Sequence, residues 1–378
     1  MNTNTSNRTY FAGLFEQKKR PKKGLLAFLV TTAAMIFSAE NVEFDFVTNR
    51  RLVAKAKQRE GSYTKNGSEI FTNKPYTPPM YKEARPYTID NFRKRVAGET
   101  IYSEEEVKAL VMDKTAEDLA DLSDKIDRSI ILQFAYVLQT GKIPFKTAKL
   151  SEKGVIADLD YECPSAHFAA ATIKWTETNA TPLTDLENRS ILIQKACGEA
   201  PDTILFGTEA WQLFLANTQV KAELDNKKIN KGIVGPQNLV IGGAAPANME
   251  KDGLNYLGYY IINGKMCGLY GYSDYYLDPQ DDTTELPYID SKNVVMMNST
   301  ARYNVYYAGI NKIIETPAEM RDFLPDARIT VIGSTSASQQ YATTVPDHNT
   351  GTVELRLESA PLVVPTDYNS FVSMQVKD

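Results

Sequence analysis

Cysteine and histidine are scarce in this chain, which holds three cysteines and two histidines among 378 residues. Cys163, Cys197 and Cys267 are scattered, odd in number and without a C-x-x-C pair, so they do not form the pattern of a disulfide framework. His167 and His348 complete the set, and no cysteine or histidine grouping has metal-ligand spacing. These absences exclude the zinc-site and disulfide-scaffold classes and favour a reducing compartment.

Catalytic motifs are also lacking. The phosphate-loop patterns G-x-G-x-x-G and G-x-x-x-x-G-K-[ST] do not occur, and Gly242-Gly243 is predicted to be a turn. There is no G-x-S-x-G elbow, and His167 is predicted to be a buried or edge histidine. One acidic cluster lacks calcium-loop spacing and is predicted to be a solvated turn; it comprises Asp274, Asp278, Asp281, Asp282 and Glu285. The chain is therefore predicted not to be an enzyme and to need no cofactor. A metal-dependent enzyme that uses this acidic cluster is the third of three hypotheses, and the other two follow below.

The chain has no excess of positive charge, with 42 basic and 47 acidic side chains. Residues 1–60 hold eleven basic and five acidic side chains, a net +6, which leaves −11 for the remainder of a chain whose total is −5. An acidic body argues against a protein that grips nucleic acid over its main surface. The twenty-one tyrosines could stack bases, but without a matching basic surface they favour protein interfaces.

Long apolar runs are absent as well. The best candidate, Gly24–Phe37, follows the basic cluster Lys18–Lys23 and precedes the small residues Ser38 and Ala39, as in a signal peptide. As a helix, this run would span roughly 21 Å, short of the roughly 30 Å hydrocarbon core, so no membrane anchor is expected. A cleaved signal stays open, and with it a secreted or surface binding protein as the second hypothesis.

The first half of the chain combines extended segments with one long helix. Glu40–Asn49 alternates like a strand, whereas Gly61–Pro86 is rich in proline, glycine and aromatics and has no core of its own. Such a segment is predicted to be a two-stranded arm that packs outside its own domain. A helix is predicted over about 103–140, from the capping box Ser103-x-x-Glu106 to Gly141, with a length of about 57 Å.

The second half mixes strands and shorter helices, which together with the long helix predicts an α+β fold. The segments are a hairpin or meander over 142–175, a helix over 182–196, a strand over 203–206, a helix over 208–215, adjacent strands over 256–276, a polar connection over 335–350 and closing strands over 352–376. Leu362–Val364 and Phe371–Val376 are predicted to be a strand pair split by a turn. We expect the chain to return there to the domain that holds the long helix.

Five stretches of the chain resemble one family in its own order. They are Phe37–Arg51 (FSAENVEFDFVTNRR), Phe71–Glu99 (FTNKPYTPPMYKEARPYTIDNFRKRVAGE), Ile204–Asn230 (ILFGTEAWQLFLANTQVKAELDNKKIN), Tyr256–Tyr276 and the closing run S-A-P-L-x-V-P-T-D-x-N-x-F-V-S within Glu358–Asp378. Together they resemble the lambda-type major capsid proteins of tailed bacteriophages, the capsid protein E family. The resemblance covers about residues 37–378.

The resemblance implies the Hong Kong 97 phage capsid fold. It assigns residues 1–45 to an N-terminal arm, 46–98 to the E-loop, 99–199 to the P-domain with its spine helix, 200–345 to the A-domain and 346–378 to strands that return to the P-domain. It implies a structural role, in which hundreds of copies form hexamers and pentamers that close into an icosahedral shell around double-stranded DNA.

The implied partners are other copies of the chain, a separate scaffolding protein, a portal, optionally a decoration protein, and packaged DNA bound without sequence specificity; no membrane is involved. The implied location is the virion, with assembly in the host cytoplasm. The side chains expected at subunit interfaces are Phe44, Arg50, Arg51, Tyr63, Phe71, Tyr76, Tyr81 and Arg85.

Overall fold

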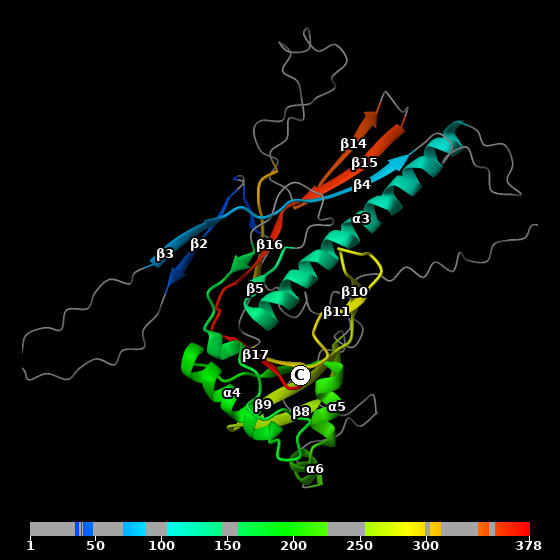
Figure 1. The fold of residues 1–378 in the computed structure, drawn as a ribbon. Helices are drawn as coiled ribbons and strands as arrows, with labels where there is room; N and C mark the ends of the chain where they lie inside the picture. Colours follow the sequence, from blue (N-terminus) through cyan, green and yellow to red (C-terminus); the bar gives the residue numbers. More distant parts are fainter. Residues whose placement is uncertain are drawn as a thin grey trace, which may run out of the picture.

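The computed structural model describes ten segments of the chain, shown in colour in Figure 1. They are residues 35–37, 39, 41–47, 71–87, 104–145, 158–225, 254–298, 303–310, 339–347 and 352–378. Helices and strands both contribute to the body of the molecule, as the α+β prediction requires.

The long helix α3 spans Glu104–Thr140 and confirms the predicted helix. Its 37 residues make about 55 Å of helix. It ends at Gly141, whose φ of 68° is left-handed and whose N–H donates to the carbonyl oxygen of Val137 at 2.9 Å. Its buried residues recur at helical spacing and include Leu122, Ile126, Ile130, Phe134, Val137 and Leu138. This apolar stripe ties the helix to the sheets beside it.

A five-stranded sheet forms the lower half of the molecule in Figure 1. Its order is β17 (Phe371–Gln375), β12 (Asn293–Met297), β7 (Thr203–Phe206), β9 (Lys265–Tyr272) and β8 (Leu254–Ile262). Only β7 and β9 are parallel. Three helices accompany the sheet: α4 (Pro182–Cys197), α5 (Thr208–Ala216) and α6 (Thr218–Asp225). The predicted helices near 182–196 and 208–215 and the strand at 203–206 are confirmed.

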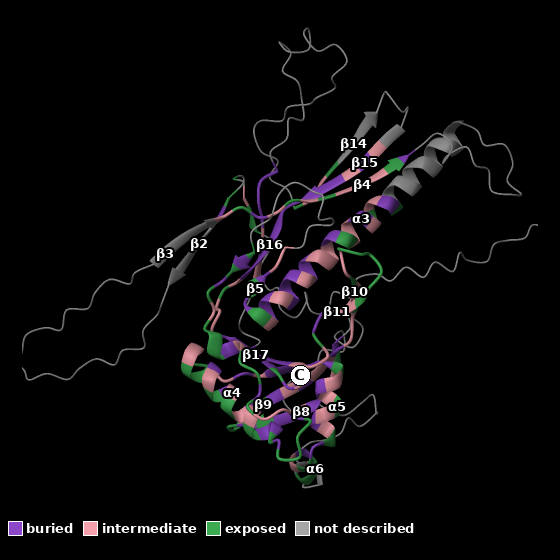
Figure 2. Cartoon of the chain, in the orientation of Figure 1, coloured by how far each residue is buried: buried purple, intermediate pink, exposed green. Residues whose placement is uncertain are grey.

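The five-stranded sheet separates two hydrophobic cores (Figure 2). Side chains alternate across a strand, so Val294 and Met296 of β12 join the core formed with α4 and α5, whereas Val295 and Met297 join the core that contains α3. The side chains of strand β17 are divided between the two cores in the same way. Central strands covered on both faces read as continuous apolar runs, which explains the sequence of β12.

Two three-stranded sheets contribute to the core around α3 (Figure 1). One has the order β14 (Tyr341–Asp347), β15 (Thr352–Ser359) and β4 (Tyr81–Tyr87), and it is antiparallel throughout. The other has the order β1 (Met35–Ile36), β13 (Tyr303–Tyr307) and β16 (Pro361–Pro365). Pro86 lies in β4, an edge strand, where the missing N–H leaves no gap inside the ladder.

Three two-stranded pairs complete the described fold. They are β2 (Val42–Val47) with β3 (Phe71–Tyr76), β5 (Lys142–Ile143) with β6 (Leu159–Asp160), and β10 (Tyr275–Leu277) with β11 (Glu285–Pro287). We call the β2–β3 pair the ribbon. In Figure 1 the ribbon extends away from the body of the molecule.

The closing strands are correctly predicted as strands, but their predicted pairing is wrong. Strand β16 pairs with β13 and strand β17 pairs with β12, so the two consecutive strands belong to different sheets. The turn between them is held by Asp367, whose carboxylate accepts from the Asn369 N–H at 2.9 Å. Both strands are almost wholly buried, so each needs its own neighbours in a sheet, and the turn carries the chain from one sheet to the other.

Two connections also differ from the prediction. The expected hairpin or meander over 142–175 contains only the short β5–β6 pair and the 3-10 helix η1 (Ser165–Phe168) in the part that the structure describes. The loop after η1 instead follows β17, because the N–H groups of Ala171 and Trp175 donate to Gln375 and Val376. The expected polar connection over 335–350 contains strand β14, whose pairing with β15 overrides its polar composition.

Candidate assembly site

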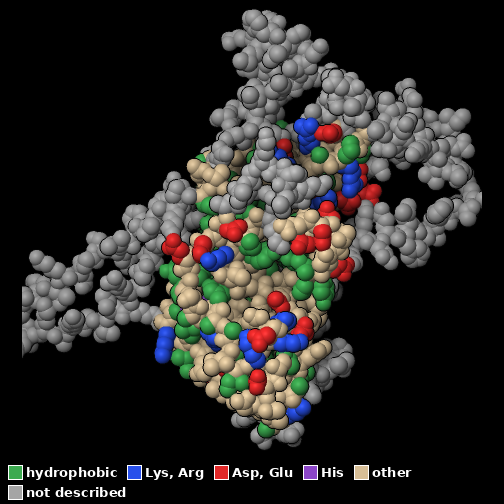
Figure 3. All heavy atoms as spheres, in the orientation of Figure 1, with side chains coloured by type: hydrophobic (Ala, Val, Ile, Leu, Met, Phe, Trp, Pro, Cys, Tyr) green, Lys and Arg blue, Asp and Glu red, His purple; other side chains and the backbone are tan. Residues whose placement is uncertain are grey.

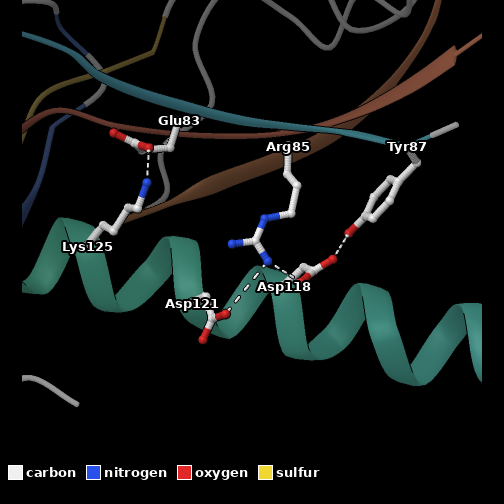
Figure 4. Close-up of polar contacts among 6 residues, drawn as sticks. All are labelled: Glu83, Arg85, Tyr87, Asp118, Asp121 and Lys125. Carbon is white, nitrogen blue, oxygen red and sulfur yellow. Dashed lines mark hydrogen bonds and ion pairs between the residues drawn. The ribbon is translucent and has the colours of Figure 1, made fainter. Parts of the chain in front are cut away.

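A row of polar contacts joins strand β4 to helix α3, and Figure 4 shows most of its members. The β4 side chains that face the helix are Tyr81, Glu83, Arg85 and Tyr87, and their partners on α3 are Asp118, Asp121, Lys125 and Gln133. We call these eight residues the β4–α3 seam. The seam holds β4, which is linked to the ribbon through residues 77–80.

The seam exists because a strand and a helix present matching rows of side chains. Residues 81, 83, 85 and 87 share one face of a strand, and the six intervals between 81 and 87 cover about 20 Å. The fifteen intervals from 118 to 133 cover about 22 Å of helix, so the two rows have nearly the same length. The strand and helix run in opposite directions, because Tyr87 meets Asp118 whereas Tyr81 meets Gln133.

Asp118 is the most buried charged residue of the seam, with 8% of its side chain exposed. One carboxylate oxygen pairs with the Arg85 guanidinium, and the other accepts from the Tyr87 hydroxyl at 2.7 Å. Tyr87 is itself buried. A buried carboxylate is costly unless it is paired and hydrogen-bonded, and Asp118 satisfies both conditions.

The other two ion pairs of the seam are more exposed. Lys125 Nζ lies 3.0 Å from Glu83 Oε2, with 53% and 38% of the side chains exposed. Asp121 Oδ2 lies 3.6 Å from Arg85 Nη1. Exposed pairs of this kind contribute about 0–1 kcal/mol each. These two pairs therefore add little to total stability.

Gln133 closes the seam with a buried side-chain amide. Its Nε2 donates to the Tyr81 hydroxyl at 3.0 Å and to the Pro361 carbonyl at 3.1 Å. Its Oε1 accepts from the Val363 N–H at 3.0 Å. One side chain of α3 thereby joins β4 to β16, and burial raises the pKa of Tyr81, which keeps that hydroxyl neutral.

The base of the ribbon is also held in place. The ring of Tyr76 stacks on Phe145, with centroids 6.3 Å apart, and burial raises the pKa of Tyr76 to about 12. Val42 is fully buried, and the Thr77 hydroxyl donates to the Asn41 side chain at 2.6 Å. The ribbon therefore leaves the body from a fixed root.

The predicted interface residues divide into three groups. Tyr76, Tyr81 and Arg85 contact other parts of the same chain, as described above. Phe44 and Phe71 lie on β2 and β3 of the ribbon. Arg50, Arg51 and Tyr63 fall outside the described residues. The interface role of all eight stays a prediction, and for the first group the structure supplies an additional role in holding the root of the ribbon.

Asp118, Lys125 and Gln133 were missed by the sequence reasoning, which followed only the apolar positions of the helix. A signal was present: polar residues recur at 118, 121, 125, 129 and 133, on a stripe beside the apolar one. Strand β4 has a matching alternation of polar residues. Nothing in either pattern alone shows that the two rows meet.

Three residues of the acidic cluster, Asp278, Asp281 and Asp282, lie in the turn between β10 and β11, as predicted, whereas Asp274 precedes β10 and Glu285 begins β11. The Thr284 hydroxyl donates to the Asp281 carboxylate, as do the N–H groups of Thr284 and Thr283 at 3.0 Å each, and these bonds lower the pKa of Asp281 to about 2. Tyr276 anchors the hairpin, with its hydroxyl 3.3 Å from that of Tyr136 on α3. Over the described segments, no group of three or more histidine, cysteine or acidic side chains could hold a metal ion.

His167 is buried, as predicted, and its Nδ1–H donates to the Phe371 carbonyl at 2.9 Å. Burial lowers the pKa of His167 below its ordinary 6.5. The unfolded chain therefore binds a proton at His167 more readily than the folded chain does. As the pH drops below about 6.5, protonation of His167 favours the unfolded chain and stability falls. Above about pH 6.5, His167 has no effect on the pH dependence of stability.

We expect His167→Asn to reduce the loss of thermal stability between neutral and mildly acidic pH, because asparagine can keep the donor without titrating. Melting temperatures measured across a pH series check this. Parallel pH profiles for the two chains would contradict it.

None of the described helices combines the length and the apolar character needed to cross a bilayer.

The protein-family model described as "Phage major capsid protein E" matches residues 12–376 of this chain. The chain belongs to the phage major capsid protein E family. The match begins before the basic cluster and runs through the position of the apparent cleavage site, and the alternative of a secreted protein has no support. No curated protein matched in the sequence search.

The chain is similar to solved structures of low sequence identity. A protein assigned as the capsid protein of an E. coli CFT073 prophage has a TM-score of 0.60 at 16% identity, covering 95% of this chain and 94% of its own. The capsid asymmetric unit of cyanophage A-1(L) has a TM-score of 0.45 at 12% identity, covering 97% and 95%. The predicted Hong Kong 97-like fold is confirmed.

As a phage major capsid protein, the chain is a structural component of the virion. Its family is a structural one and not an enzyme class. Capsid proteins assemble with copies of themselves into shells.

Proposed function

We propose that this capsid protein forms hexamers and pentamers, and that hundreds of copies close into an icosahedral shell around double-stranded phage DNA. The observation that supports this best is the ribbon, which extends from the body on a fixed root (Figure 1). An isolated two-stranded hairpin is at best marginally stable in water. A ribbon with a firmly held root therefore suits a contact with a neighbouring subunit.

The ribbon and the residues that connect its strands carry the remaining interface candidates. Phe44 and Phe71 belong to the two strands, whereas Arg50, Arg51 and Tyr63 lie between them in the sequence. Aromatic residues and arginine are enriched at the centres of protein interfaces. We assign these five to the contact with the next subunit.

The proposed domains follow the chain order: an arm at 1–45, the E-loop at 46–98, the P-domain at 99–199, the A-domain at 200–345 and a closing segment at 346–378. Strands β15, β16 and β17 support the return of the closing segment to the P-domain, because all three lie against α3. Strand β17 belongs to the five-stranded sheet with β7, β8 and β9. The closing segment thus returns to the P-domain, and through β17 it also joins strands of the proposed A-domain.

The proposed contact with packaged DNA is weak and independent of sequence. On the face drawn in Figure 3, acidic and basic side chains are interspersed, with no broad basic patch among the described residues. An acidic body avoids strong binding to phosphates, so packaged DNA stays releasable. The proposal includes a separate scaffolding protein, a portal, optionally a decoration protein, and assembly in the host cytoplasm.

We expect deletion of residues 48–70, with Asn-Gly joining the two strands, to abolish shells while leaving the subunit folded. Val47 and Phe71 are directly paired, and Asn-Gly is the preferred two-residue hairpin turn. Sedimentation and negative-stain microscopy of the purified protein give the assembly state, and circular dichroism with thermal melting gives the fold.

The full chain under the same conditions is the control, and it should sediment as capsomers or shells. A folded deletion variant that forms normal shells would contradict the interface role assigned to Arg50, Arg51 and Tyr63, which lie between the strands of the ribbon. A full chain that stays strictly monomeric under all assembly conditions would contradict the proposed function itself.

A further inference from the structure

The charges along the β4–α3 seam are arranged in an order that fits one alignment only. Arg85 faces Asp118 and Asp121, and Glu83 faces Lys125 (Figure 4). Glu83 and Arg85, which are neighbours on one face of the strand, thus carry opposite charges. Each of them contacts a side chain of opposite charge on the helix.

A shifted alignment would bring like charges together. A slip of one residue turns the row away from the helix, so the smallest slip that keeps the same face is two residues, or about 6.6 Å. In one direction this slip puts Arg85 opposite Lys125. In the other it puts Glu83 opposite the aspartates that hold Arg85, and each case replaces attraction by repulsion.

The charges on the outer face of the same sheet also favour the observed alignment of β4. Lys82 pairs in register with Glu358, and Ala84 pairs with Arg356. The slip that moves Glu83 toward Asp118 also sets Lys82 opposite Arg356. Both faces of β4 therefore disfavour this slip.

Apolar contacts alone would select the alignment less strictly. Beside β4, strand β15 contributes the buried side chains Leu355 and Leu357 to the core around α3. Hydrophobic attraction has no direction, and the two-residue slip nearly equals one helical turn of about 5.4 Å. Hydrogen bonds and ion pairs require particular distances and angles, so the polar row distinguishes alignments that apolar contacts leave nearly equivalent.

The alignment of β4 determines where the ribbon leaves α3. Strand β3 ends at Tyr76 and β4 begins at Tyr81, so only four residues separate the ribbon from the seam. A two-residue slip would move the root of the ribbon along the helix by about 6.6 Å.

We propose that Glu83, Arg85, Asp118 and Lys125 set the diameter of the shell by fixing the position of the ribbon root relative to α3. This inference rests on the proposed function, in which the ribbon contacts the next subunit. A displaced root changes the angle between neighbours, and in a closed shell that angle determines the curvature.

The test uses full chains with Glu83→Lys alone and combined with Lys125→Glu. In the native alignment the introduced lysine would oppose Lys125, whereas in the slipped alignment it would meet the two aspartates. We expect the single variant to give shells with a shifted or mixed diameter. The double variant restores opposite charges in the native alignment and should restore the original single diameter.

Glu354→Lys is the matched control, because Glu354 forms a 2.7 Å ion pair with Arg356 on the outer face of the same sheet. This variant should keep the diameter of the unchanged chain. Diameters are measured on individual particles by electron microscopy, and melting temperatures of unassembled protein report stability separately.

Shells of unchanged diameter from Glu83→Lys would overturn the inference. Failure of the double variant to restore the original diameter would overturn it as well. If the unchanged chain forms no shells, the proposed function fails instead, so the two failures are distinguishable.

Discussion

Phe371→Ala is expected to lower the free energy of unfolding by about 3–5 kcal/mol, the usual cost of truncating a buried phenylalanine. Phe371 is fully buried in β17, and its ring centroid lies 6.0 Å from that of Tyr303 and 6.2 Å from that of Phe168. The strand separates the two cores, so a cavity here weakens the sheet that both cores share. Urea unfolding of the unassembled protein measures the loss.

Gln375→Ala provides the control for this prediction. It lies in the same strand with an exposed side chain, so its effect should stay within about 0.5 kcal/mol. A loss below about 1 kcal/mol for Phe371→Ala would mean that the core around β17 is loosely packed, contrary to the structure.

Asp118→Ala is expected to lower the free energy of unfolding by about 2–4 kcal/mol, because it leaves the Tyr87 hydroxyl and the Arg85 guanidinium without their carboxylate partner. The lower part of that range reflects the 36% exposure of the Arg85 side chain, which water can partly solvate. Urea unfolding again gives the magnitude. The free energy of unfolding of Asp118→Asn should lie between those of the unchanged protein and Asp118→Ala, because the amide oxygen of asparagine can still accept from Tyr87.

Asp121→Ala is the matched control one turn along the helix. Asp121 lies 3.6 Å from the same guanidinium, with 31% of its side chain exposed, so we expect a loss below about 1 kcal/mol. Equal losses for Asp118→Ala and Asp121→Ala would show that burial and the bond to Tyr87 contribute nothing at this position.

Much of the secondary structure was predictable from local patterns. Helix α3 follows from a long apolar periodicity ended by Gly141, and β7 with α5 follows from a short apolar strand before a helical repeat. The ordered family stretches led to the capsid fold. Pairing was predicted less well, because the alternation within β16 and β17 shows that each is a strand but not which strand lies beside it.

At the assembly site too, some residues were predicted from the sequence but their contacts were not. Arg85 and Tyr81 were selected as interface residues from the sequence, whereas their partners Asp118 and Gln133 lie 33 and 52 residues further along the chain. Contacts at such separations depend on how the strand and the helix are placed against each other. Composition and periodicity do not contain that placement.

The amino-acid sequence by itself determined the elements of this capsid protein, their order and its family, because these depend on residue patterns within short windows. The tertiary structure decided that the closing strands belong to two sheets and that β4 meets α3 through a row of opposite charges. Both features arise from side chains distant in sequence that become neighbours only when the cores are packed, so physical proximity, and not local preference, determines them.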